Sequence, residues 1–178
     1  MAAVLGRDAR RLHILKIVQC LGLPDCWIAA GFLRNAMWDD LHGRPPRQAY
    51  GDVDVIWFDP SRTSAEADAA LEAKLAQRDP SVRWSVKNQA RMHERNGDPP
   101  YASAADAMRH WVETTAAVAV RMNPTGRLEF SAPLGTDYVF DMVLRPVPRF
   151  RGCKHPIFLA RMTEKRWSEE WPLLRLGE

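Results

Sequence analysis

Residues 51–58, GDVDVIWF, decide how this chain is interpreted. The β-branched and aromatic residues between Gly51 and Pro60 predict a strand. Side chains two apart in a strand leave the same face, so Asp52 and Asp54 are expected to lie roughly 7 Å apart. Two carboxylates so close repel each other unless a cation sits between them. The pair is therefore a candidate site for Mg²⁺, which binds one or two carboxylates together with substrate phosphates.

A glycine turn upstream of this strand supplies the complementary half of the site. Residues 26–30 form a short apolar run that predicts a buried strand, and the chain passes through Gly31 into a predicted helix over 32–41. The first N–H groups of a helix have no internal partners, so they form an anion site. Arg34, in the first turn, is expected to reach the same phosphate. Asn35 either holds the turn or points its side-chain amide at the ligand.

The rest of the chain alternates between helices and strands. The predicted helices cover 8–22, 32–41, 63–78 and a segment that starts at Ser103, and the predicted strands cover 26–30, 52–58, 82–87, 117–122 and 128–130. Residues 63–66 form a predicted capping box, in which Thr63 and Glu66 satisfy each other's free N–H groups. The tryptophans at core-facing positions are Trp27, Trp57, Trp84 and Trp111.

This alternation predicts an α/β (α+β) fold in which one small mixed sheet is flanked by helices. We expect a single domain over 1–178. Beyond Pro146 the hydrophobic pattern weakens, so a less regular C-terminal segment is expected over about 146–178.

A polar cluster follows the predicted strand over 82–87. Lys87, Asn88 and Arg91 are residue types that bind phosphates or base edges, and they fall at the strand end next to the acidic pair. The alternative is a solvated strand end with a capped turn. A lone histidine such as His93 is more often structural than catalytic. Because a positive cluster there would lie opposite the acidic pair, we favour a binding role.

Composition limits the class of protein. The chain has 178 residues, of which 46% are hydrophobic and 26% charged, so it can form its own core and is not a disordered chain. It has no apolar run long enough for a transmembrane helix and no signal-peptide pattern, so we expect a cytoplasmic protein without a membrane partner. Three cysteines without metal-type spacing are expected to be reduced thiols. The dispersed net charge of +3 does not indicate a nucleic-acid partner and does not exclude one.

The chain closely resembles a bacterial family of nucleotidyltransferase-like proteins within the DNA polymerase β-type nucleotidyltransferase superfamily. The segments that carry the resemblance are WIAAGFLRNAMWDDLHG at 27–43, GDVDVIWFD at 51–59, WSVKNQARMH at 84–93, WVETTAAVAVRM at 111–122 and APLGTDYVFDMVLRP at 132–146. The resemblance implies a single-domain nucleotidyltransferase fold. It also implies transfer of a nucleoside monophosphate from an NTP to an acceptor, and it leaves that acceptor unidentified.

The resemblance assigns roles to the residues already singled out. It implies that Asp52 and Asp54 are catalytic carboxylates that hold two Mg²⁺ ions, which grip the NTP phosphates and activate an acceptor hydroxyl. It implies that Gly31 and the backbone after it cradle the triphosphate. The predicted nucleotide-binding residues are Gly31, Phe32, Arg34, Asn35, Lys87, Asn88 and Arg91.

The chain departs from the superfamily pattern at three points. Phe32 stands where a second small residue is expected in the turn, and the gap between the glycine and the acidic pair is longer than usual. The strand over 82–87 carries no third carboxylate, for which Glu129 and Asp141 are the candidate replacements. The alternative function is therefore a catalytically inactive module that binds a nucleotide or a partner. An RNA-tailing enzyme would need a separate RNA-binding domain or a strongly basic face, and the sequence indicates neither.

Overall fold

The computed structural model describes residues 1–45, 47 and 51–177. The two prolines and two glycines of segment 42–51 predict a loop, and residues 46 and 48–50 of that segment lie outside the described part. Its helices are α1 (Ala2–Gly6), α2 (Ala9–Gln19), α3 (Gly31–Leu41), α4 (Ala65–Arg78), α5 (Gln89–Asn96), α6 (Ala104–Met108), α7 (Asp137–Phe140), α8 (His155–Lys165) and α9 (Trp167–Glu170), and its 3₁₀ turns are η1 (Thr114–Ala116), η2 (Pro148–Phe150) and η3 (Gly152–Lys154). Its strands are β1 (Trp27–Ala29), β2 (Val53–Trp57), β3 (Trp84–Asn88), β4 (Ala119–Met122), β5 (Leu128–Ser131), β6 (Val143–Leu144) and β7 (Arg175–Leu176).

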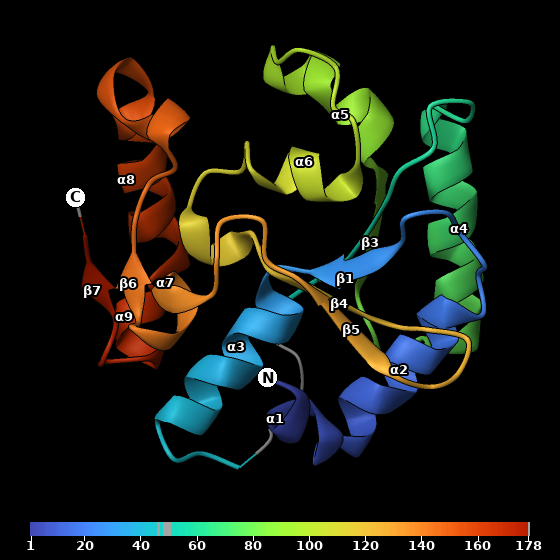
Figure 1. Cartoon of the computed structure of the whole chain (residues 1–178), viewed down its shortest axis with the longest axis horizontal. Coiled ribbons are helices and arrows are strands. Elements are labelled where there is room, and N and C mark those ends of the chain that lie inside the picture. Colours follow the sequence, from blue (N-terminus) through green and yellow to red (C-terminus); the bar gives the residue numbers. More distant parts are fainter. Residues whose placement is uncertain (46, 48–50, 178) are drawn as a thin grey trace.

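The first five strands form one mixed sheet in the order β3-β2-β1-β4-β5 within the described residues. β2 and β3 are parallel, and every other neighbouring pair is antiparallel. Parallel strands need a crossover connection, which α4 provides here. The predicted small mixed sheet flanked by helices is confirmed (Figure 1).

The alternation of side chains along β2 gives the sheet a core face and an open face. Val53, Val55 and Trp57 point into the main core and are at most 2% exposed. Asp54 and Ile56 are out of phase with them and point to the opposite face. Ile56 packs there in a smaller cluster that includes α6. Figure 1 shows α2 and α3 on one side of the sheet and α5 and α6 on the other.

The structure corrects the sequence prediction at the start of one helix and contains helices that the hydrophobic pattern does not reveal. The predicted capping box over 63–66 is wrong in its residues, because Ser64 rather than Thr63 caps α4 and accepts a hydrogen bond from the Ala67 N–H at 3.2 Å. α5 has no counterpart among the predicted elements. Its sequence, QARMHERN, is almost entirely polar, so it carries little hydrophobic periodicity.

The C-terminal segment packs on α3 through tryptophans. Trp38 is fully buried, and its ring makes edge-to-face contacts with Trp167 at 5.9 Å and Trp171 at 5.2 Å between centroids. The Trp171 indole N–H donates to Asp39 at 2.8 Å. These contacts hold α9 against α3. The segment after residue 146 also contains α8, a helix of 11 residues that was not predicted.

Candidate functional site

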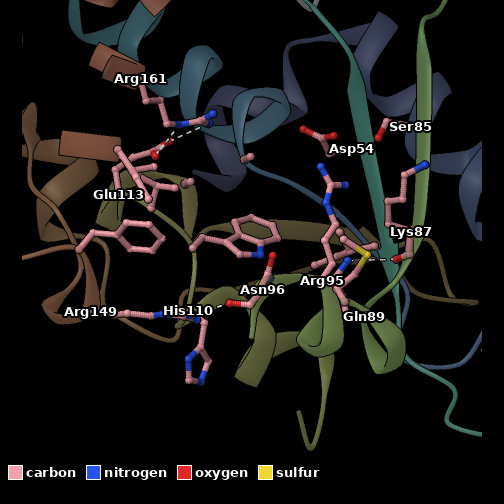
Figure 2. A pocket seen from close by; sticks show the side chains of 18 of the residues that line it. Asp54, Ser85, Lys87, Gln89, Arg95, Asn96, His110, Glu113, Arg149 and Arg161 are labelled. Carbon is pink, nitrogen blue, oxygen red and sulfur yellow. Dashed lines mark hydrogen bonds and ion pairs between the residues drawn. The ribbon is translucent and has the colours of Figure 1, made fainter. Parts of the chain in front are cut away.

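A cavity of about 650 Å³ opens on the face of the sheet that carries Asp54. Residues of β2 and β3 form its floor. Its walls come from α5, from the segment between α6 and η1, and from the C-terminal elements η2, η3 and α8. Segments far apart in sequence therefore meet around the acidic pair (Figure 2).

The two carboxylates predicted from the sequence both line this cavity. Asp54 lies opposite Ser85 across the parallel β2–β3 pair. Burial raises the pKa of Asp54 above its usual value and the charge of Asp52 raises it further, whereas a hydrogen bond with Ser85 lowers it. Asp52 precedes the strand, is about half exposed and forms an ion pair with Arg83 at 2.7 Å. The structure thus brings both carboxylates to one place with different degrees of burial.

The turn between β1 and α3 reaches the same cavity. Ala29 is the register partner of Asp54, and the next residue, Ala30, lines the cavity. No described side chain caps α3, which begins at Gly31. Ala30 adopts φ 52° and ψ −121°, a conformation that favours glycine, so the strained position is the one before the glycine that the sequence singles out. Phe32 is 1% exposed and belongs to the core, not to the cavity lining.

Arg34 and Asn35 lie behind the cavity and are absent from its lining. The Arg34 guanidinium lies over the rings of Trp38, at 4.6 Å, and Trp167, at 4.1 Å, and it donates to the Asn35 side-chain oxygen at 3.1 and 3.2 Å. Burial lowers the pKa of Arg34 to about 10, against the opposing effect of Glu113. The structure places both residues where they support α3, and their predicted contact with a nucleotide stays a prediction.

Glu113 links α8 to α3 and was not identified from the sequence. Its side chain is 0% exposed, accepts hydrogen bonds from Arg161 at 2.7 and 3.1 Å, and lies 3.5 Å from Arg34. Both Glu113 and Arg161 line the cavity (Figure 2). The one sequence signal for Glu113 is a carboxylate in the otherwise uncharged stretch 111–120.

The predicted polar cluster at the end of β3 divides into two groups. Lys87 lines the cavity, whereas Asn88 and Arg91 do not. Asn88 is fully buried, and its side-chain amide donates to the Asp59 carbonyl at 2.8 Å. The Arg91 guanidinium donates to the buried carboxylate of Asp68 at 3.0 Å. Asn88 and Arg91 therefore hold the β3–α5 junction together, and their role in nucleotide binding stays a prediction.

Basic side chains outnumber carboxylates in the cavity, six to three among the described lining residues. The basic residues are Lys87, Arg95, Arg149, Lys154, Arg161 and Lys165. Figure 2 shows Lys87 and Arg95 on one side of the cavity and Arg149 and Arg161 on the other. Within the described part of the chain, Arg95 and Lys154 have no carboxylate partner. A concave surface with this excess of positive charge favours a polyanion.

Two aromatic side chains, Trp111 and Phe150, also line the cavity. Trp111 was predicted to be a core residue, but it is only partly buried and faces the cavity. Flat rings of this kind stack on nucleobases without preference for sequence. The cavity therefore combines carboxylates, cations and stacking surfaces.

Comparison with known proteins assigns the fold to a family. The family model described as nucleotidyltransferase matches residues 16–176. The chain belongs to this nucleotidyltransferase family. An NMR structure described as a CCA-adding enzyme head domain is 35% identical to this nucleotidyltransferase, with a TM-score of 0.82 over 93% of this chain and 88% of that chain. A search of curated proteins finds no match.

More distant solved structures share the fold of this nucleotidyltransferase. A CCA-adding enzyme with CTP is 14% identical, with a TM-score of 0.63 over 98% of this chain and 42% of that chain. The Thermotoga maritima CCA-adding enzyme complexed with tRNA is 16% identical, with a TM-score of 0.57 over 94% and 38%. The chain spans less than half of these two enzymes. Within its described residues, no helix has the length and apolar character needed to cross a bilayer.

The two positions considered from the sequence for a third carboxylate both lie away from the cavity. Glu129 forms an ion pair with Arg121 at 2.7 Å on β4 and β5, and Asp141 follows α7; neither lines the cavity. Ser85 occupies the β3 position beside Asp54. Among the residues that the structure describes, no group of three or more His, Cys, Asp or Glu is arranged to hold a metal ion.

Proposed function

We propose that the protein is a Mg²⁺-dependent enzyme that moves a nucleoside monophosphate from an NTP to an acceptor. Nucleotidyl transfer in general follows from the family. The observation that carries the finer proposal is the position of Asp52 and Asp54 on the floor of a cavity with basic walls. The structure of a distant relative with CTP supports an NTP as the donor.

The oxygen atoms at the acidic pair suit Mg²⁺. This ion prefers oxygen ligands, keeps several waters, and is usually held by one or two carboxylates together with substrate phosphates. Asp52 and Asp54 supply the carboxylates, and the charge of Asp52 is one reason that the pKa of Asp54 is raised. Asp52 and Asp54 would hold a divalent cation, which would offset this repulsion and supply positive charge beside the triphosphate. A second ion would take its remaining ligands from substrate.

Other groups in the cavity orient the nucleotide. The uncapped start of α3 offers free N–H groups and the positive end of the helix dipole to phosphate oxygens. Another wall of the cavity, built by η3 and α8, carries basic side chains that attract the negative charge of the triphosphate: Lys154, Arg161 and Lys165. In this arrangement the triphosphate lies between α3 and α8, with its α-phosphorus near Asp54. Trp111 offers a ring on which the base stacks.

Replacement of both carboxylates tests the assignment. The double variant Asp52→Asn with Asp54→Asn should lose Mg²⁺-dependent NTP binding, and pyrophosphate release should fall by about 10²-fold or more, because the charges that position the metal are gone. Asp137→Asn is the matched control, since this exposed carboxylate lies on α7 outside the cavity. If the double variant, with an unchanged melting curve, binds Mg-NTP as tightly as the parent, the site is wrongly assigned.

A module that binds nucleotide without turnover is the second candidate. The observation that favours it is Ser85 at the strand position beside Asp54, with no third carboxylate grouped with the pair in the described residues. Incubation with each labelled NTP and Mg²⁺ or Mn²⁺ separates the two functions. NTP binding without pyrophosphate release across a broad set of acceptors favours the module.

A further inference from the structure

We propose that the acceptor is a phosphate monoester, whose anionic oxygen attacks the α-phosphorus of the NTP. The enzyme would then form a phosphoanhydride rather than a phosphodiester. This inference rests on the proposed function and specifies its acceptor. It follows from the side chains on the part of the cavity through which the acceptor must approach.

The acceptor approaches from the side of β3 and α5. In nucleotidyl transfer the attacking and leaving oxygens lie roughly in line through the phosphorus. With the leaving pyrophosphate between α3 and α8, the attacking oxygen must reach Asp54 from the opposite side. Figure 2 shows Ser85, Lys87 and Arg95 on that side, whereas Arg161 lies across the cavity.

Among the residues that the structure describes, this side offers no free carboxylate or imidazole to take a proton from a hydroxyl. A hydroxyl acceptor loses its proton during attack, so a positioned general base accelerates the reaction. The β3 residues that face the cavity are Ser85 and Lys87, and neither is a carboxylate or an imidazole. His110 also lines the described cavity, but it belongs to another wall, where its ring lies tilted against that of Tyr101 with 5.1 Å between centroids.

The carboxylates of the cavity have other partners. Asp52 and Asp54 are the proposed metal ligands. Glu113 is fully buried and accepts two hydrogen bonds from Arg161. The described lining residues therefore leave no carboxylate free on the acceptor side. An acceptor oxygen that is already ionised does not need a carboxylate as general base.

The acceptor side instead carries positive charge. Arg95 lines the cavity from α5, has no carboxylate partner in the described residues, and directs its guanidinium into the cavity (Figure 2). A guanidinium binds two oxygens of one phosphate at once. Lys87 also lines the cavity, two residues beyond Ser85 along β3, but its ammonium lies 3.6 Å from the Glu72 carboxylate and donates to the Val86 carbonyl. A phosphate monoester matches the guanidinium of Arg95, whereas a neutral hydroxyl does not.

The chemistry of a phosphate monoester fits this arrangement. Its second pKa is about 6, so it is mostly a dianion at about pH 7. One of its oxygens forms a bond to the α-phosphorus, while the bond from the α-phosphorus to the oxygen that bridges to the β-phosphate breaks. The electron pair of that bond leaves with pyrophosphate. No proton is removed from the acceptor, and the product contains a new phosphoanhydride.

Matched acceptor pairs test the proposal on the full chain. The protein is incubated with Mg²⁺, each NTP and one acceptor from three matched pairs. The pairs are glucose 1-phosphate and glucose, glycerol 3-phosphate and glycerol, and an oligoribonucleotide with a terminal phosphate and the same oligoribonucleotide with only terminal hydroxyls. We expect pyrophosphate release with phosphorylated acceptors alone, and phosphorus NMR should show the new phosphoanhydride. The active phosphorylated acceptor tells whether the monoester comes from a small metabolite or an RNA end.

Variants of Arg95 test the binding site for this acceptor. Arg95→Gln should raise KM for the phosphorylated acceptor on the order of tenfold, as expected for losing hydrogen bonds to a charged group, and should leave KM for the NTP unchanged. Arg95→Lys should retain part of the binding. The matched control is Arg109→Gln, because Arg109 is exposed at the end of α6 and does not line the cavity.

Three results would overturn the proposal. The first is turnover of acceptors that carry only hydroxyl groups, and the second is an unchanged acceptor KM in Arg95→Gln. The third is metal-dependent NTP binding by the parent with no pyrophosphate release across the phosphorylated acceptors. That third result leaves the NTP site in place, whereas an absence of NTP binding by the parent contradicts the proposed function itself.

Discussion

Replacing Glu113 by Gln should destabilise this fold far more than the loss of a surface ion pair. The carboxylate is fully buried, accepts hydrogen bonds from Arg161 and lies 3.5 Å from Arg34. Arg34 is 3% exposed, so water cannot compensate its charge once the carboxylate is gone. Gln keeps the shape and one acceptor oxygen of the native side chain but removes its negative charge.

The expected cost comes mainly from Arg34. Removing one partner of a buried ion pair costs about 3–5 kcal/mol. The Arg161 side chain is 33% exposed, so it recovers hydration and the lower end of this range applies. The stacking of Arg34 on Trp38 and Trp167 remains in the variant. We expect a loss of about 3 kcal/mol, which for a chain of this length lowers Tm by about 6–12 °C.

Urea unfolding and thermal melts of the purified variants measure this loss. Adding Arg34→Met to Glu113→Gln removes the unpaired charge and should restore part of the stability. Glu129→Gln is the matched control, because the ion pair of Glu129 with Arg121 is partly exposed and its loss should change the stability little. A loss below about 1 kcal/mol in Glu113→Gln, or no recovery in the double variant, refutes the assignment of a buried charge pair.

Two other predictions concern the backbone and the pH dependence. Ala30→Gly should stabilise the protein by about 1 kcal/mol, as measured in thermal melts. The φ of 52° strains alanine by about 1–3 kcal/mol, and the greater entropy of glycine in the unfolded chain offsets about 0.4–1 kcal/mol of the relief. A lower Tm in the variant contradicts this. Hydrogen bonds from Arg10 and Ser81 lower the pKa of Asp79 to about 2. The ionised carboxylate therefore stabilises the fold at any pH above the ordinary pKa of aspartate, and this stabilisation is lost as the pH falls toward 2. Asp79→Asn should therefore be less stable than the parent at neutral pH and approach it in acid, as measured by urea unfolding, and a difference independent of pH contradicts the reasoning.

The sequence by itself determined the floor of the candidate site. Strand alternation is a local property, so it predicts a shared face for Asp52 and Asp54 without knowledge of any neighbour. In the structure Asp52 directly precedes β2, and both residues line the cavity. The strand, glycine turn and helix around Gly31 are also local, and the structure contains them as β1 and α3. The family resemblance follows the same contiguous segments and is confirmed by the family model.

Tertiary structure alone decided which polar residues face the cavity. Arg91 and Arg95 look alike in the sequence, but Arg91 meets the buried Asp68 of α4, 23 residues away, and Arg95 meets no carboxylate in the described chain. A charged side chain is drawn to whichever opposite charge is buried beside it, and that partner can come from any element. Glu113 and Arg161 are 48 residues apart, so the wall that α8 builds opposite the acidic pair exists only after the chain has folded.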